Sequence, residues 1–167
     1  MSTNTTATEL RKLYRTTVFI GLAMMASLVV YYIVVAVIES RNEQFSGYAP
    51  VPQDVFTILR YVLLGMTAVE FFIIRVLNTA MLSAKIPNAS AAAPISLLMS
   101  ASVVTFALCE SVAVYGLVLF LIQGSTTDFY LFLMISLLFF TVYFPKYSKW
   151  EEWVRERERQ KGMRRQK

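Results

Sequence analysis

An ionisable side chain lies in the middle of the most lipid-like stretch of this chain, "FALCESVAVYGLVLFLI" at residues 106–122. This carboxylate, Glu110, is followed at once by the hydroxyl of Ser111 and five residues later by that of Tyr115. Burying a charge at the centre of a bilayer costs at least about 2.5–3.5 kcal/mol, so such residues usually face a partner or a cavity. Because carboxylate and hydroxyl oxygens suit a proton or a hard cation, Glu110, Ser111 and Tyr115 are candidates for binding an ion.

The usual groups of enzyme active sites are missing from the sequence. It has no histidine and one cysteine, Cys109, which excludes Ser-His-Asp triads, Cys/His zinc sites and an intrachain disulfide. It also has no glycine-rich nucleotide-binding loop. We therefore predict a protein that is not an enzyme and that has no metal site and no cofactor other than H⁺ or Na⁺.

The composition indicates that lipid surrounds most of the chain. Of the 167 residues, 56% are hydrophobic and only 16% are charged, against about 25% charged in soluble domains. Since about 20 apolar residues span a bilayer, the sequence predicts an all-α polytopic bundle of four transmembrane helices. The apolar runs are residues 16–38, 55–84, 95–123 and 129–144. The fourth run is short, and we expect aromatic residues that follow it, including Trp150, to anchor it at the interface.

Lys and Arg gather at the two ends of the chain. Residues 1–15 and the tail 145–167 are basic, whereas the connections at 39–54 and 124–128 are acidic. The positive-inside rule therefore predicts two cytoplasmic termini. The net charge of +5 then reflects topology, and we expect no nucleic-acid partner. We also expect the tail to form a basic cytoplasmic helix.

The second and third runs form a predicted hairpin around a proline-containing cytoplasmic turn at 85–94. This places Glu70 and Glu110 at similar depth, near the bilayer centre. Glu110 then has three interpretations: a site for H⁺ or a cation, a buried ion pair with Arg75, or a neutral acid that bridges two helices by a hydrogen bond. In the first interpretation, Glu70 and Arg75 set the affinity of the site from the facing helix.

The segment "ALCESVAVYGLVLFLI" (107–122) resembles the second helix of the c subunit of F-type ATP synthases. That helix has a Glu followed by Ser or Ala, then apolar residues, Tyr-Gly-Leu-Val and a further apolar run. The resemblance implies that Glu110 is the ion-carrying carboxylate. It also implies that Ser111 and Tyr115 help to coordinate the ion where the family binds sodium.

The chain departs from a typical c subunit in several ways. The first c-subunit helix has alternating glycines, whereas the run 55–84 contains only Gly65 and adds Phe71 and Phe72. The Gln that completes the family's sodium site has no clear counterpart, although Thr67 or Asn78 could replace it. The first and fourth spans and the tail have no place in a hairpin subunit. A tightly packed rotor ring is therefore not expected.

These observations predict a non-catalytic integral membrane protein whose hairpin binds or carries H⁺ (or Na⁺). The alternative is a structural or assembly subunit of an energy-coupling complex, with Glu110 paired to Arg75. We expect the bacterial plasma (inner) membrane as its location, with the bilayer and other membrane subunits as partners. Self-association through the third span is a further possibility, because small residues form a stripe there at Ser96, Ser100, Ala107 and Ser111.

Overall fold

The computed structural model describes residues 3–42, 45–83, 92–148, 150–152, 154–156 and 159. Within these residues the chain forms helices and no strand, as predicted. The four long helices are α1 (Thr3–Arg41), α2 (Gln53–Ser83), α3 (Ala92–Gln123) and α4 (Thr126–Tyr143). Each is long and apolar enough to cross a membrane.

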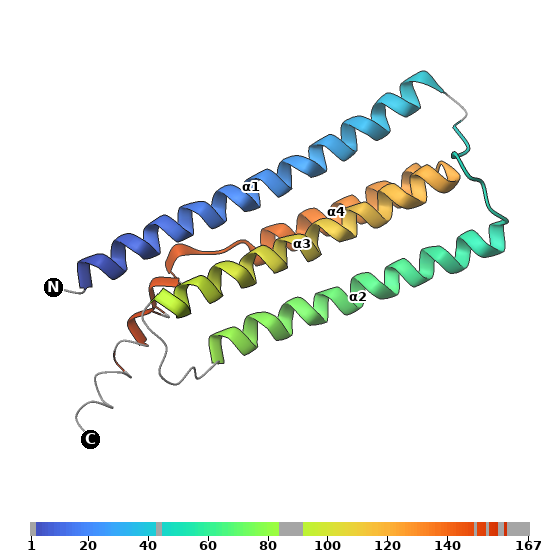
Figure 1. Cartoon of the computed structure of the whole chain (residues 1–167). Coiled ribbons are helices and arrows are strands. Elements are labelled where there is room, and N and C mark those ends of the chain that lie inside the picture. Colours follow the sequence, from blue (N-terminus) through green and yellow to red (C-terminus); the bar gives the residue numbers. More distant parts are fainter. Residues whose placement is uncertain are drawn as a thin grey trace.

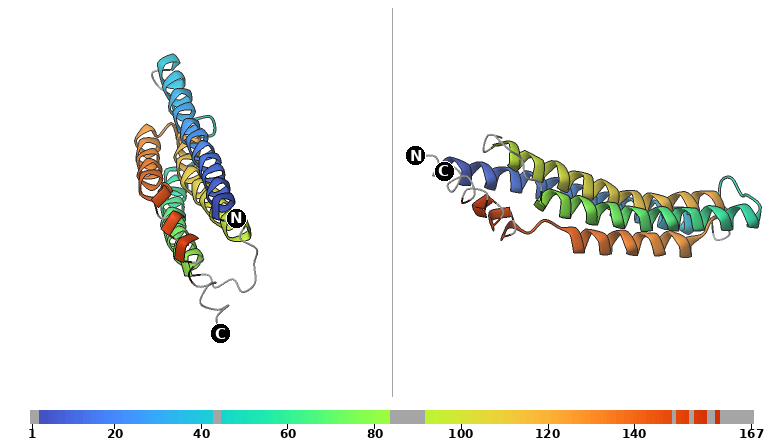
Figure 2. Two further views of the ribbon diagram at one scale, coloured as in Figure 1. Left: turned by 90° about the vertical axis from the view of Figure 1, so that its left-hand side faces the viewer. Right: turned by 90° about the horizontal axis from the view of Figure 1, so that it is seen from below.

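The helices run alternately up and down along one common axis (Figure 1). Helix α3 is central, since it packs against α1, α2 and α4. Helices α1 and α2 lie on opposite sides of the α3–α4 pair (Figures 1 and 2). Any residue on α3 can therefore face one of three different neighbours, depending on its position around the helix.

The helix bounds extend the predicted spans. Helix α1 begins at Thr3 and runs without a break for 39 residues, so the predicted N-terminal segment 1–15 belongs mostly to this helix. At 1.5 Å per residue, α1 is about 58 Å long, well beyond the ~30 Å hydrocarbon core. Helix α4 begins at Thr126, which places Asp128 in its first turn and not in a connecting loop. The predicted turn 85–94 falls mostly outside the described residues.

Aromatic side chains form the contact between α3 and α4. The Phe106 and Phe140 rings stack with their centroids 5.8 Å apart, and Phe132 is fully buried. The two backbones approach closely at Gly116, where an added Cβ would lie 2.7 Å from the Cβ of Phe132. The buried Ser136 hydroxyl of α4 also donates to the Cys109 carbonyl of α3, at 2.6 Å. This pair of helices has the most extensive contact in the bundle.

The outer faces of α1, α2 and α4 carry large exposed apolar side chains, such as Phe19, Val76 and Met134. The most exposed of these, Phe19, has 75% of its surface accessible. Exposure of so much apolar surface suits a protein surrounded by lipid acyl chains.

The segment between α1 and α2 folds back over the turn between α3 and α4. The Tyr48 N–H donates to the Leu121 carbonyl at 2.8 Å. Gly47 and Gly124 have φ values of 91° and 69°, in the left-handed region that favours glycine. A Cβ on Gly47 would also clash with the Ile122 carbonyl oxygen. This end of the bundle is therefore closed by backbone contacts.

The opposite end of the bundle joins the beginning of the chain to its tail. Trp150 is only 5% exposed and packs with Leu10 and Leu98, while the Tyr14 hydroxyl donates to the Pro145 carbonyl at 3.1 Å. The expectation that Trp150 anchors the fourth span in the interface is thus wrong, because its ring is enclosed by α1 and α3. The described residues of the tail from 147 onward are helical, and Glu151 forms an ion pair with Arg155 one turn later.

Candidate ion-binding site

Glu110 lies close to the middle of α3 and turns toward α1. Its Oε1 atom accepts hydrogen bonds from the Ser27 hydroxyl at 2.5 Å and from the Tyr31 hydroxyl at 2.8 Å. Ser27 and Tyr31 are four residues apart, so they lie on the same face of α1, one turn above the other. Two hydroxyl groups from one helix therefore converge on a single carboxyl oxygen of the next helix.

Glu70 has the same surroundings on the other side of α3. Its Oε1 atom accepts hydrogen bonds from the Ser111 hydroxyl at 3.0 Å and from the Tyr115 hydroxyl at 2.6 Å. Glu70 belongs to the buried stripe of α2, between Thr67 and Ile74, and is 7% exposed. Its other oxygen, Oε2, is buried and has no hydrogen-bond partner among the described residues.

The structure brings the predicted site residues together in a different combination. Ser111 and Tyr115 contact Glu70 and not Glu110. Successive helix residues are about 100° apart, so Glu110 and Ser111 face different neighbours, α1 and α2. The Thr67 hydroxyl donates to the Leu63 carbonyl within its own helix, at 3.0 Å.

Arg75 does not join this site. Among the described residues the ion pairs are Arg60–Asp128 and Arg155–Glu151, and Arg75 is exposed. The expected ion pair between Glu110 and Arg75 is therefore not formed. Arg75 lies about 140° around α2 from Glu70, so it turns away from α3 when Glu70 turns toward it.

Ser27 and Tyr31 are site residues that the sequence reasoning missed. A signal for them exists, because "SLVVY" at 27–31 and "SVAVY" at 111–115 share the pattern Ser-x-x-Val-Tyr. The first copy lies in an apolar run that has no carboxylate at that depth. Its partnership with Glu110 is therefore recognised only when α1 is placed beside α3.

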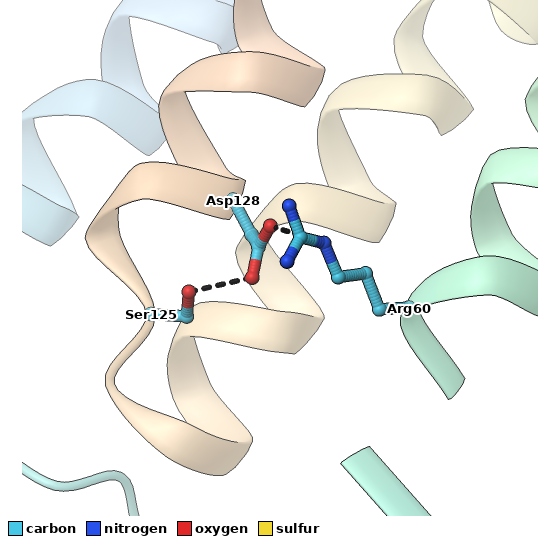
Figure 3. Close-up of polar contacts among 3 residues, drawn as sticks. All are labelled: Arg60, Ser125 and Asp128. Atoms are coloured by element: carbon cyan, nitrogen blue, oxygen red, sulfur yellow. Dashed lines mark hydrogen bonds and ion pairs between the residues drawn. The ribbon is translucent and has the colours of Figure 1, made fainter. Parts of the chain in front are cut away.

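A separate polar cluster joins α2 to α4 at the end of the bundle that holds the α3–α4 turn (Figure 3). The Arg60 Nε atom lies 2.8 Å from Asp128 Oδ1, and the Ser125 hydroxyl donates to Asp128 Oδ2 at 2.6 Å. The Asp128 side chain is 4% exposed and that of Arg60 is 42% exposed. Asp128 thus has a cationic partner, which neither Glu70 nor Glu110 has among the described residues.

The two glutamates must be compensated in another way. An unpaired carboxylate in an apolar medium is very costly, and it normally becomes neutral or binds a cation. The oxygens available at each glutamate are those of a carboxyl group, a serine and a tyrosine. The described residues contain no group of three or more His, Cys, Asp or Glu side chains that could hold a metal ion.

Comparison of the chain with protein-family models, curated proteins and solved structures finds no match. The resemblance to c subunits therefore depends on residues 107–122 alone.

Proposed function

We propose that this chain is a non-catalytic integral membrane protein whose α2–α3 hairpin binds H⁺, or Na⁺, at the intramembrane carboxyl group of Glu110. The observation that carries the proposal is the environment of this group. It lies near the middle of a membrane-length helix, accepts two hydroxyl hydrogen bonds, and pairs with no basic residue among those described. The resemblance of residues 107–122 to a c-subunit helix supports the same role.

Carbodiimide labelling of the protein in membranes tests this proposal. The reagent attacks protonated carboxyl groups in apolar surroundings, and peptide mass spectrometry locates the modified residue. We expect Glu110 to be labelled at acidic pH and the labelling to fade as the pH rises. Glu110→Gln provides the control, and an absence of labelling at every pH would contradict the proposal.

A structural or assembly role is the second candidate, because the same hydrogen bonds connect α3 to α1 and to α2. In this role Glu110 is a neutral acid that holds helices together and does not exchange its proton. Labelling would then be the same at all pH values, and Glu110→Gln would leave assembly with other subunits unchanged. Arg75→Leu should not alter the labelling in either case, since Arg75 does not contact Glu110.

A further inference from the structure

The polar groups in the middle of the bundle form two copies of one arrangement. The Glu110 unit joins Glu110 of α3 to the Ser-x-x-Val-Tyr pattern of α1, and the Glu70 unit joins Glu70 of α2 to the same pattern in α3. Helices α1 and α3 run in the same direction (Figure 1), so serine precedes tyrosine along the same direction in both units. Both units therefore present the same groups in the same order.

The serine of the Glu110 unit is within hydrogen-bond distance of two acceptors at once. Its Oγ atom lies 2.6 Å from the Met24 carbonyl oxygen and 2.5 Å from Glu110 Oε1. A serine hydroxyl has one proton but two lone pairs. If that proton goes to the Met24 carbonyl, the contact between Ser27 and Glu110 needs a second proton, which the carboxyl group can supply.

The serine of the Glu70 unit repeats this geometry. Its Oγ atom lies 2.8 Å from the Leu108 carbonyl oxygen and 3.0 Å from Glu70 Oε1. If Glu70 is neutral, its own proton can replace that of Ser111 in the contact between them: the carboxyl then donates to Ser111, Ser111 donates to the Leu108 carbonyl, and Tyr115 donates to the carboxyl. An ionised Glu70 leaves two acceptors competing for one serine proton.

The second oxygen of Glu70 supports the neutral form independently. Oε2 is buried and has no hydrogen-bond partner among the described residues. Leaving the carbonyl oxygen of a neutral acid without a donor costs far less than leaving a charged carboxylate oxygen without one. Glu70 as a whole is buried, so solvent does little to relieve that charge.

We infer that Glu70 is a second proton-binding carboxyl group, of the same design as Glu110, and that both units bind H⁺ in preference to Na⁺. This inference depends on the function proposed for Glu110. The choice of H⁺ follows from the distances, because carboxyl and serine oxygens 2.5–3.0 Å apart are in direct hydrogen-bond contact. A cation coordinated between them would hold these oxygens further apart.

Infrared difference spectroscopy of the full-length protein in lipid vesicles tests the inference without needing a reagent to reach Glu70. Spectra at acidic minus alkaline pH should contain a carbonyl band of carboxylic acids in apolar surroundings. Glu70→Gln and Glu110→Gln should each remove about half of this band. The amide of glutamine keeps a donor and an acceptor, so both variants should fold, and Glu9→Gln is the matched control at an exposed position.

Serine variants show which glutamate gives which half of the band. Ser111→Ala removes the acceptor of Glu70 and should shift that half of the band to higher frequency, while Ser27→Ala should shift the other half. Loss of band in Glu110→Gln alone would overturn the inference and leave the proposed function standing. Loss of the band on replacing choline by Na⁺ at constant pH would identify sodium sites and overturn the choice of H⁺. A band that neither glutamine variant reduces would refute both proposals.

Discussion

Carboxyl side chains inside a membrane need compensation, and this protein uses two kinds. Asp128 is paired with the guanidinium of Arg60. Glu70 and Glu110 are surrounded by hydroxyl groups that can accept as well as donate a proton. A guanidinium fixes the charge state of its partner, whereas hydroxyl groups allow that state to change. The difference predicts a role in stability for Asp128, and it supports the proposal that the two glutamates exchange protons.

The first prediction concerns the two arginines of α2. Arg60→Leu leaves the nearly buried Asp128 without its cation, and breaking a buried pair costs about 3–5 kcal/mol. Because Arg60 is 42% exposed, we expect a smaller loss, about 2 kcal/mol in the free energy of unfolding. Arg75→Leu is the matched control and should change stability by less than about 0.5 kcal/mol.

Reversible unfolding in detergent micelles measures both variants. The double variant Arg60→Leu/Asp128→Asn should recover part of the loss, because it removes the stranded charge as well. A loss for Arg75→Leu as large as that for Arg60→Leu would argue instead for an ion pair between Arg75 and a buried carboxylate.

At the scale of helices, α3 holds the bundle together by presenting a different surface to each neighbour. It contacts α4 through close backbone approach and aromatic rings, and it contacts α1 and α2 through carboxyl–hydroxyl bonds. The contact with α1 also depends on shape, since an added Cβ at Gly21 would lie 2.8 Å from the Phe106 ring. If Glu70 and Glu110 exchange protons as proposed, the exchange should act on the attachment of α1 and α2 and leave the α3–α4 pair unchanged.

The second prediction compares two glycines. Gly116→Val places a side chain 2.7 Å from the Phe132 Cβ and 3.0 Å from the Phe129 carbonyl oxygen, so α3 and α4 must separate. Overpacking of this kind costs about 1–3 kcal/mol. Gly65→Val is the control, because an added Cβ at Gly65 meets nothing within 4 Å. Thermal unfolding in detergent should detect a lower Tm for Gly116→Val only, and equal effects would contradict the close α3–α4 contact.

The open position of Gly65 also bears on the c-subunit resemblance. In that family, glycines on the first hairpin helix allow close packing, whereas here the close contacts of glycines within described helices lie at Gly116 of α3 and Gly21 of α1. Helix α3 packs against other helices of the same chain. Its small residues lie on different faces: Ser111 is hydrogen-bonded to Glu70, whereas Ala107 is exposed.

The sequence predicts the helices of this protein better than it predicts their contacts. Long apolar runs can only be spans, because a bilayer leaves no other way to satisfy the backbone. The rotation of each helix about its own axis is set by packing. Hydropathy does not predict this rotation when nearly all faces of the helix are apolar. Glu110, Ser111 and Tyr115 therefore do not contact one another as a triad: Ser111 and Tyr115 contact Glu70, and Glu110 contacts α1, since adjacent residues face different helices.

At the scale of the whole molecule, the beginning of α1 and the first described turns of the tail lie together. Packing of Leu10, Tyr14 and Trp150 joins the beginning of α1 to the tail, and the segments that connect α1 to α2 and α3 to α4 meet at the other end. Combined with the distribution of Lys and Arg, this arrangement predicts that the Trp150 end is cytoplasmic.

Single-cysteine labelling tests this topology, because the chain has one cysteine and it is fully buried. In a Cys109→Ala background, cysteines are introduced at four exposed positions: Glu9, Ser46, Thr127 and Ser148. A membrane-impermeant maleimide added to intact cells should label the variants at 46 and 127 and spare those at 9 and 148. The reverse pattern would keep the bundle and overturn its orientation. Labelling of only one residue from either pair would contradict the up-and-down bundle, because both residues of a pair lie at the same end.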